Sequence, residues 1–451
     1  MEQKYTAVWR GGVGDLGPQM DFKKSLLRKI CYLEQEEEIK AALARGEDVN
    51  YQGGRNQTCL MAAASQCSED HHKIIRLLLD HPSIEVNMAD DKGCTALHWA
   101  TMLGRVEAVK ILLADERVDV NIQNADNLTV LMYAARKSSE NQASILKLLL
   151  EQPSTDVNLA DDDGLTALHG AIDSKNIEAV RLMLADKRVN ANCEKSSGIT
   201  PLLMAAADAD SIEIFKLLLS EPRVDVNLGD KEGVSPLHRA VVSGNTEAVK
   251  LLLADARVDV NCKNCDQVTP LIWATSKAES IDMFRLLLSD QRVNVNLAGT
   301  IGKRGGDMTA LMVASRDSNV EAVKLLLDDE RVDVNWTSDS GMRAVHIAAG
   351  VKGRIKIMEL FLAHPRVDVI CKRPTLLHHA VAENNVEAVK LMLAEPRFTS
   401  ADVLDEQAGV AAVRIAAVNG YWAVLKELVL HPSTDLAVKD KDGWSVDDLA
   451  R

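Results

Sequence analysis

The chain has 451 residues and is 47% hydrophobic but only 4% aromatic, a balance that suits helices packed through Leu, Val and Ala. Its formal net charge of −14 argues against binding of nucleic acid phosphates, for which Lys and Arg must predominate on some face, and it favours a basic partner. No apolar run approaches the roughly 20 residues of a membrane span, no signal peptide follows Met1, and the eight cysteines form no disulfide framework, so we expect no membrane insertion and a cytoplasmic protein, or alternatively a nuclear one.

Residues 1–20 are expected to be a flexible leader. The run Gly-Val-Gly-Asp-Leu-Gly at 12–17 matches the G-x-G-x-x-G pattern of nucleotide-binding loops. Such a loop must open a helix within a unit that also supplies a second strand. Pro18 follows instead, and no second strand is present, so a leader is favoured over nucleotide binding.

Residues 21–50 are predicted to be an N-terminal capping repeat. Two helices, 21–33 and 34–44, close at Gly46, and the acidic run 34–38 gives them a polar outer surface. The ends of a repeat stack require such polar surfaces.

The repeated unit is clearest over residues 88–121. A turn at 90–93 ends in Gly, which tolerates a positive φ. Thr95 then caps a helix through its hydroxyl, and Gly104 ends that helix.

The second half of the unit is a longer helix and an extended peptide. The helix over 106–113 carries an apolar stripe, which consists of Ala108, Val109, Leu112 and Leu113. The peptide Arg-Val-Asp-Val-Asn at 117–121 alternates polar and apolar residues, which predicts a short strand. The unit is therefore helix, turn, helix and a short β-finger.

Both halves of the unit recur along the chain. The Arg-Val-Asp-Val-Asn peptide or a looser copy ends at Asn87, Asn121, Asn158, Asn192, Asn227, Asn261, Asn296 and Asn335. Thr/Ser-x-Leu-His ends at His98, His169, His238 and His378. A fixed period of this kind indicates stacked repeats, so residues 51–437 are predicted to be one continuous array.

These motifs resemble the ankyrin repeat over about residues 21–450. Thr-x-Leu-His opens the inner helix, Glu-Ala-Val-Lys-x-Leu-Leu forms the outer helix, and Asp-Val-Asn leads into the finger. The resemblance implies an all-α solenoid with short β-hairpin fingers and about 11 full repeats between capping units. The last unit, 438–451, is expected to be a half-repeat cap, or alternatively the place where a longer chain was cut.

One departure from the ankyrin pattern is systematic. Outer helices usually close with Gly before Asp-Val-Asn, but here only Gly46 does so. Elsewhere an extra residue or a Pro is present, as at Pro82. A longer turn that tolerates proline therefore replaces helix termination by a left-handed Gly.

The repeats alternate in pairs. Each repeat is marked by the apolar residue of Thr-x-Leu, and these markers are Leu60, Leu97, Leu131, Leu168, Leu202, Leu237, Leu271, Leu311, Val345, Leu377 and Val413. Every second step between markers is 34 residues, apart from the last. His follows the marker in one set and Met, Leu or Ile in the other, with His346 and Met312 as exceptions. We infer a duplicated pair of repeats, in which the His bonds the Thr hydroxyl and a neighbouring backbone group and the alternate units make apolar contacts.

Two segments interrupt the regular pattern. A basic, Gly-rich insertion at 299–306 is interpreted as a mobile loop at a finger tip, with a contact loop as the alternative. Residues 397–413 are the most degenerate part of the array.

No motif indicates catalysis or metal binding. Cys262 and Cys265 form a lone C-x-x-C, whereas zinc needs four ligands. Adjacent histidines point about 100° apart on a helix and cannot easily share an ion; these are His71–His72 and His378–His379. Because no Gly-x-Ser-x-Gly and no distinct Cys/His pair is present, we expect no enzyme activity, no metal and no cofactor.

The resemblance implies that a partner lies across the fingers and inner helices. The residue after the His position, and those one turn later, should face it. Trp, Tyr and Arg dominate interface energetics, although the Trp and Tyr rings have the alternative of folding down between the inner helices. The candidate partner-binding residues are Trp99, Met102, Leu103, Tyr133, Arg136, Met204, Arg239, Trp273, Lys277, Arg316, Ile347 and His379. We expect Trp99→Ala to cost little stability but to weaken binding.

The expected function is that of a monomeric scaffold or adaptor, which binds a protein partner, such as a basic or extended peptide, on the concave face of the solenoid. The alternative is a targeting or regulatory arm of a larger catalytic or channel protein. Asn87 and Asn121 each stand eight residues after a Leu, which resembles the consensus for asparaginyl hydroxylation in ankyrin proteins. Ordering of the finger by Asn hydrogen bonds is expected as well and is compatible with that modification.

Overall fold

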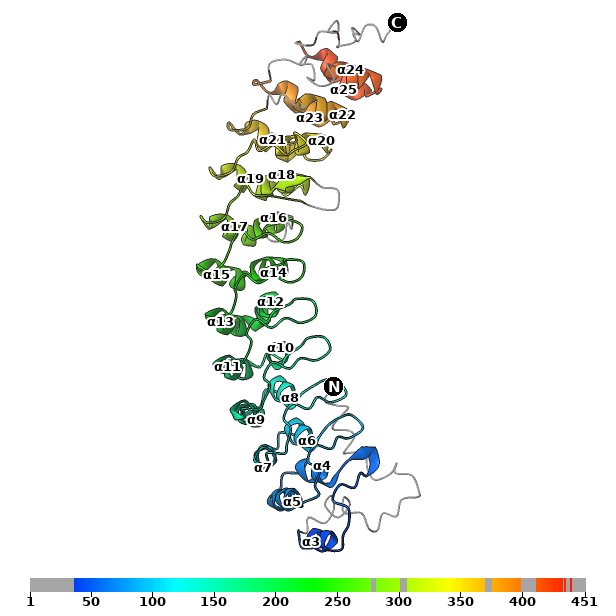
Figure 1. Ribbon diagram of the computed structural model, residues 1–451. Coiled ribbons are helices and arrows are strands. Elements are labelled where there is room, and N and C mark those ends of the chain that lie inside the picture. The colour runs from blue at the N-terminus through cyan, green and yellow to red at the C-terminus, as the bar shows by residue number, and fades with distance from the viewer. Residues whose placement is uncertain are drawn as a thin grey trace. The chain divides into compact units, whose positions relative to one another are not determined.

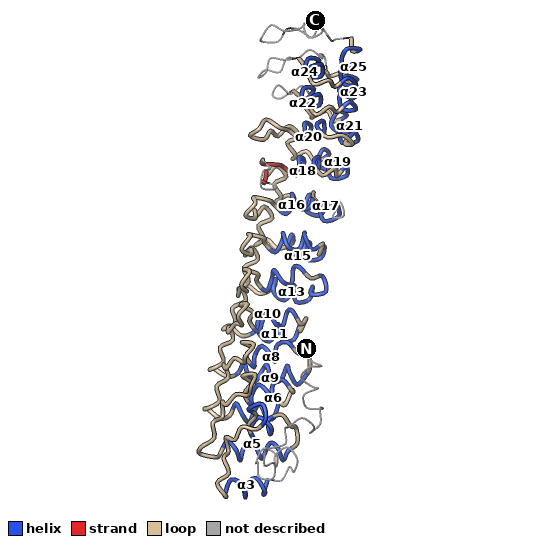
Figure 2. Tube along the Cα trace, turned by 90° about the vertical axis from the view of Figure 1, so that its right-hand side faces the viewer, coloured by secondary structure: helices blue, strands red, loops and turns tan. Residues whose placement is uncertain are grey.

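The computed structural model describes residues 36–276, 281–300, 306–369, 375–398 and 411–432, together with 434 and 439. The chain divides into two compact units, residues 1–205 with 210–225 and residues 206–209 with 226–451. Within each unit, outer helices form one column and inner helices a second, and the finger loops extend from the inner helices on the side away from the outer ones (Figure 1). Figure 2 shows the same separation of loops from helices in a second view.

The described part of the first unit begins with α3 (Glu36–Ala44) and the 3-10 turn η1 (Gly54–Asn56). Its helix pairs are α4 (Cys59–Ala64) with α5 (Glu69–Leu79), α6 (Ala96–Met102) with α7 (Val106–Leu113), α8 (Val130–Arg136) with α9 (Glu140–Glu151), and α10 (Ala167–Asp173) with α11 (Ile177–Ala185). The division between the units passes through α12 (Pro201–Ala207) and η2 (Ala209–Ser211), and α13 (Ile212–Ser220) belongs to the first unit.

The second unit repeats this arrangement. Its elements are α14 (Pro236–Ser243) with α15 (Thr246–Ala254), α16 (Pro270–Thr275) with α17 (Ile281–Ser289), β1 (Ala298–Thr300), β2 (Asp307–Thr309), α18 (Ala310–Arg316) with α19 (Val320–Asp328), α20 (Ala344–Gly350) with α21 (Ile355–Ala363), α22 (Leu376–Ala382) with α23 (Val386–Ala394), and α24 (Ala412–Val418) with α25 (Trp422–Leu430).

The helix boundaries follow from local chemistry. Thr95 caps α6, because its hydroxyl accepts the His98 N–H, and Gly104 ends the segment at φ 67°. The apolar stripe predicted for α7 is buried at Ala108, Val109 and Leu112, but Leu113 is only half-buried, and Ile111, which lies outside the predicted stripe, is buried. Inner and outer helices are therefore held by the side chains that the sequence pattern identifies.

Several outer helices are capped by Asn residues that also reach the preceding repeat. Asn176 Oδ1 accepts the Ala179 N–H at 3.2 Å, and its Nδ2 donates to Ala135 O at 2.9 Å. The Asn therefore satisfies a free N–H at the start of one helix and a free carbonyl near the end of another. Asn245, Asn319 and Asn385 make the same two contacts.

The prediction of a short strand at 117–121 is wrong. The peptide forms consecutive turns, and Asn121 N donates to Asp119 Oδ1 at 2.9 Å within it. In the copy at 223–227, both Val224 and Val226 are buried. The alternation therefore reports two valines packed beneath a turn, and side chains rather than a neighbouring strand satisfy the backbone.

The Asn that closes each finger joins it to the next one. Asn121 Nδ2 donates to Ser154 O at 2.8 Å, and Asp156 N donates to Asn121 Oδ1 at 2.8 Å. The finger is thus ordered by Asn hydrogen bonds, as expected. The same two bonds are made by Asn50, Asn87, Asn158, Asn192, Asn227, Asn261, Asn296 and Asn335.

The Arg of the same peptide shows how outer helices end without Gly. Arg117 Nη2 donates to Leu79 O, in the last residue of α5, at 2.6 Å, while Asp115 accepts from Arg117 Nε at 2.9 Å. A cation at a helix C-terminus satisfies free carbonyls and the helix dipole. Helix α5 is therefore closed by the repeat that follows it. The same bond to a preceding outer helix is made by Arg188, Arg223, Arg292, Arg331, Arg366 and Arg397.

The insertion predicted at 299–306 forms a hairpin at its base. β1 pairs antiparallel with β2, with Gly299 opposite Met308, and residues 301–305 lie outside the described ranges. A Cβ on Gly299 would lie 2.5 Å from Gln267 O, so only Gly lets this strand run along the preceding finger. Also outside the described residues lie the predicted leader, the helix 21–33, Lys277 and all of the C-terminal cap except Lys439.

Candidate functional site

The histidines of the inner helices form a buried polar network. Thr95 N donates to His98 Nδ1 at 3.2 Å, and the Thr95 hydroxyl lies 3.0 Å from the same nitrogen. His98 Nε2 donates to Leu128 O at 3.2 Å, which confirms the expected bonds and ties α6 to the next finger. The equivalent bonds to the next finger run from His169 to Ile199 and from His238 to Val268.

Burial keeps these rings neutral. Desolvation lowers the pKa of His98 and of His169, and it lowers the pKa of His238 to about 4. A second proton would have to sit on Nδ1, which already accepts a backbone N–H. Protonation is therefore incompatible with the network.

The alternate units replace the ring with an apolar side chain, as expected. Met61 is buried at the His position of α4, and its sulfur lies 3.5 Å from Thr58 N. Met132 is buried in α8, where Thr129 still caps the helix by accepting the Met132 N–H at 3.2 Å.

Two cysteines lie beside these histidines, a proximity that the sequence analysis missed. Cys262 Sγ is 3.6 Å from His238 Nδ1 and 3.0 Å from Ser235 Oγ. Burial raises the pKa of Cys262 to about 11, whereas a nucleophilic cysteine needs a lowered pKa and a protonated base. Both groups are neutral at neutral pH, so the pair is packing rather than a catalytic dyad. Cys193 repeats it beside His169.

The C-x-x-C motif leads to no metal site in the described residues. Cys262 is half-buried against His238, while Cys265 is exposed. Within residues 36–276, 281–300 and the later described ranges, no group of three or more His, Cys, Asp or Glu side chains could hold a metal ion.

Aromatic rings at the position after the inner-helix His, which is predicted to face a partner, are held by the histidine of the preceding repeat. Tyr133 meets His98 edge to face, with ring centroids 6.2 Å apart, and Asn124 Nδ2 donates to the Tyr133 hydroxyl at 2.9 Å. In the second unit Trp273 meets His238 in the same way at 5.2 Å. Both rings are half-buried, so each offers a fixed apolar surface.

Trp99 lies in the interior of the first unit. Its side chain is only 8% exposed, and its Nε1 donates to Asp90 Oδ2 at 3.0 Å. The ring therefore folds down, and the expectation that Trp99→Ala costs little stability is wrong. Removing a buried Trp typically costs about 3–5 kcal/mol.

The other candidates lie at the surface to different degrees. Leu103 is 37% exposed. Half-buried candidates in the first unit are Met102, Tyr133, Arg136 and Met204, and those in the second are Arg239, Trp273, Arg316, Ile347 and His379.

The arginines differ in their partners. Arg239 Nη2 lies 2.7 Å from Asp230 Oδ2, and Arg316 Nε lies 2.7 Å from Asp317 Oδ1. Arg136 instead lies across α10, where its Nε would be 3.0 Å from a Cβ on Gly170.

The sequence analysis did not identify the finger residues that bind the candidate partner-binding side chains. Asp90, Asn124 and Asp230 each bind the side chain nine residues later, at Trp99, Tyr133 and Arg239. The constant spacing was the available signal. It was overlooked because Asp and Asn in a turn are already explained by their backbone bonds, such as that from Lys92 N to Asp90 Oδ1.

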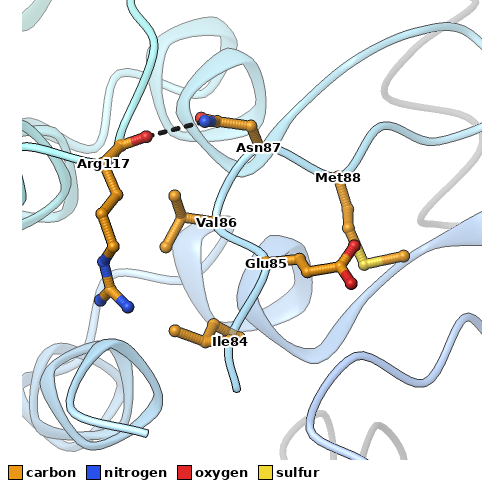
Figure 3. A pocket seen from close by; sticks show the side chains of 6 residues that line it. All are labelled: Ile84, Glu85, Val86, Asn87, Met88 and Arg117. Atoms are coloured by element: carbon orange, nitrogen blue, oxygen red, sulfur yellow. Dashed lines mark hydrogen bonds between the residues drawn. The ribbon is translucent and has the colours of Figure 1, made fainter. Parts of the chain in front are cut away.

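A shallow pocket of about 410 Å³ lies beside the first described fingers (Figure 3). Its lining consists of Ile84, Glu85, Val86, Asn87, Met88 and Arg117. Asn87 Nδ2 donates to Arg117 O at 2.7 Å across the pocket, and the Glu85 side chain points toward Met88 (Figure 3). Both amide atoms of Asn87 and of Asn121 are hydrogen bonded, and hydroxylation of these residues stays a prediction.

The search for membrane-spanning helices covered the described residues alone. None of their helices combines the length and the apolar character that crossing a membrane requires.

Known proteins match the chain through its repeats. The family described as ankyrin repeats (3 copies) matches residues 27–124, 113–196, 131–230, 202–299 and 296–373. A putative ankyrin repeat protein of Fowlpox virus (strain NVSL), FPV223, is 29% identical over 130 residues, which are 29% of this chain and 86% of the viral protein. The crystal structure of EF0377, an ankyrin repeat protein, is 26% identical and matches with a TM-score of 0.40, covering 46% of this chain and 98% of that one. Because the family matches extend over most of the sequence, the chain belongs to the ankyrin repeat family.

Proposed function

We propose that this chain is a non-catalytic scaffold that binds a protein partner against the inner helices and fingers of its units. Ankyrin repeats generally serve protein–protein interaction. The observation that carries the proposal is the way Tyr133 and Trp273 are held, each edge to face against a histidine and half-buried. A ring that is already fixed loses little entropy when a partner covers it.

The test is a pull-down with matched surface variants. Leu103 stands at the end of inner helix α6 and is 37% exposed, and Ile177 begins outer helix α11 and is 41% exposed. Leu103→Glu should release a partner that the intact chain and Ile177→Glu both retain, with equal unfolding midpoints for the two variants. Loss of the partner with Ile177→Glu alone would place binding on the outer helices.

We also propose that the scaffold is a cytoplasmic monomer. Sedimentation equilibrium should give the mass of one chain, and a fluorescent fusion should fill the cytoplasm. A dimer mass or a purely nuclear signal would contradict these two statements separately from the binding proposal.

A further inference from the structure

Arg136 differs from the other cations of the first unit's inner-helix surface. Lys137 Nζ donates to Met102 O at 3.0 Å, and Arg105 Nε donates to Ser65 O at 2.9 Å. Among the described residues, the Arg136 guanidinium has neither an ion pair nor a hydrogen bond. Arg136 is half-buried as a residue, and its guanidinium keeps hydrogen-bond donors that no acceptor among the described residues uses.

Gly170 leaves room for the Arg136 side chain. A Cβ at Gly170 would stand 3.1 Å from Arg136 Cγ and 3.0 Å from its Nε, so even alanine would make this side chain shift by a few tenths of an ångström. Three other repeats of the unit place a large side chain at this position, namely Trp99, Tyr133 and Met204, and the repeat of α4 places Ala62 there. The glycine leaves a notch in that row, and the Arg136 side chain lies against it.

The surroundings of the notch combine positive charge with apolar surface. Lys137 adds a second cation next to Arg136, Tyr133 stands one turn before it on α8, and Leu103 is exposed on the preceding inner helix. Asp161 and Asp173 belong to the repeat of Gly170, but neither forms an ion pair with Arg136 in the described structure. Within the described residues, the positive charge of Arg136 is therefore not paired with either carboxylate.

We propose that Arg136 recognises a carboxylate of an extended peptide partner, with Tyr133 and Leu103 receiving the apolar residues beside it. A guanidinium binds a carboxylate through two parallel hydrogen bonds. This proposal rests on the proposed binding function and refines it, because the net charge alone favours a basic partner, whereas the notch selects an acidic side chain or a C-terminus.

The test begins with random peptides displayed on phage and selected against the intact chain. Enriched peptides should share an acidic residue next to apolar ones. The best of them is then synthesised with its carboxylate and with the corresponding amide. Arg136→Gln should weaken the carboxylate peptide by about tenfold or more, while the amide peptide should bind both proteins equally.

Two further variants separate recognition from folding. Gly170→Met introduces the residue that Met204 places at this position; it keeps Arg136 but should fill the notch and weaken the same peptide. Arg181→Gln removes an exposed cation of outer helix α11 that pairs with Glu178, and it should change nothing. Thermal unfolding checks that the three variants are folded.

The outcomes distinguish this proposal from the broader one. Basic peptides, no enriched peptide, tighter binding of a phosphopeptide, or equal binding of the carboxylate peptide to Arg136→Gln would each overturn carboxylate recognition. If a partner is nevertheless released by Leu103→Glu in the pull-down, the binding function stands without it.

Discussion

The buried histidines should make the protein less stable in mild acid. Replacing His238 with Met, which other repeats carry at this position, should remove the contribution of that histidine. His238 donates from Nε2 to Val268 O at 2.9 Å and is neutral, with a pKa lowered by burial to about 4 against an ordinary 6.5. A lowered histidine pKa means that the folded state binds a proton less readily than the unfolded state does. This contribution is therefore complete above pH 6.5 and is lost as the pH falls from 6.5 toward 4.

The magnitude follows from the pKa difference. Between pH 7.5 and pH 5, one such histidine should cost about 2 kcal/mol, and the full shift is worth about 3 kcal/mol. At pH 5 the carboxylates that pair with arginine, such as Asp255, are still ionised because hydrogen bonding to Arg257 lowers the Asp255 pKa. The interval from pH 7.5 to pH 5 therefore reports mainly on histidine.

The assay is urea unfolding of the full chain followed by circular dichroism at pH 7.5 and pH 5.0. His238→Met provides the matched variant, because Met132 and Met312 fill the same position in other repeats. The variant should lose about 2 kcal/mol less than the parent between the two pH values. Identical pH dependence of parent and variant would refute the argument that burial of His238 sets its protonation.

Three further predictions concern the packing of an outer helix, the Asn hydrogen bonds between fingers, and asparagine hydroxylation. Leu112→Ala should lower the free energy of unfolding by roughly 2–5 kcal/mol, while Leu103→Ala on the exposed side should stay within about 0.5 kcal/mol in the same denaturation assay. Asn121→Ala removes two exposed hydrogen bonds between fingers and should lower the free energy of unfolding by about 1–2 kcal/mol. An unchanged unfolding midpoint would show that these bonds do not stabilise the protein. Intact-mass spectrometry should show additions of one oxygen that disappear when Asn87 and Asn121 are both replaced by Ala, and a purely unmodified chain from its native source would contradict hydroxylation.

The helices could be predicted because their causes are local. Thr95, Gly104 and the stripe in residues 106–113 fix α6 and α7 through capping, a left-handed turn and the helical period. Each of these signals lies within a few residues of the structure that it determines, so no knowledge of distant parts of the chain is needed.

The finger peptide shows where local reasoning failed. Its alternation of polar and apolar residues matched a strand, yet Asn121 bonds Ser154 and Asp156 in the next finger and leaves no role for a sheet. The deciding contacts lie more than thirty residues away in the chain, which a period-two pattern cannot reveal.

The candidate surface was predictable by position but not by environment. Tyr133 and Trp273 are at the surface, whereas Trp99 at the equivalent position is buried against Asp90. The sequence positions are the same in all three repeats. The difference depends on the residues that the preceding repeat and the finger place beside each ring.

The sequence by itself determined the family, the order of the helix pairs and their buried faces, because stacked repeats encode each contact with a regular spacing. Only the tertiary structure decided how the repeats are joined and what each surface side chain of the inner helices contacts. Arg117 closes the helix that ends at Leu79, and Arg136 lies against Gly170 with no acceptor among the described residues. Both depend on side chains that reach from one repeat into another, where the identity of the neighbour rather than the spacing sets the interaction.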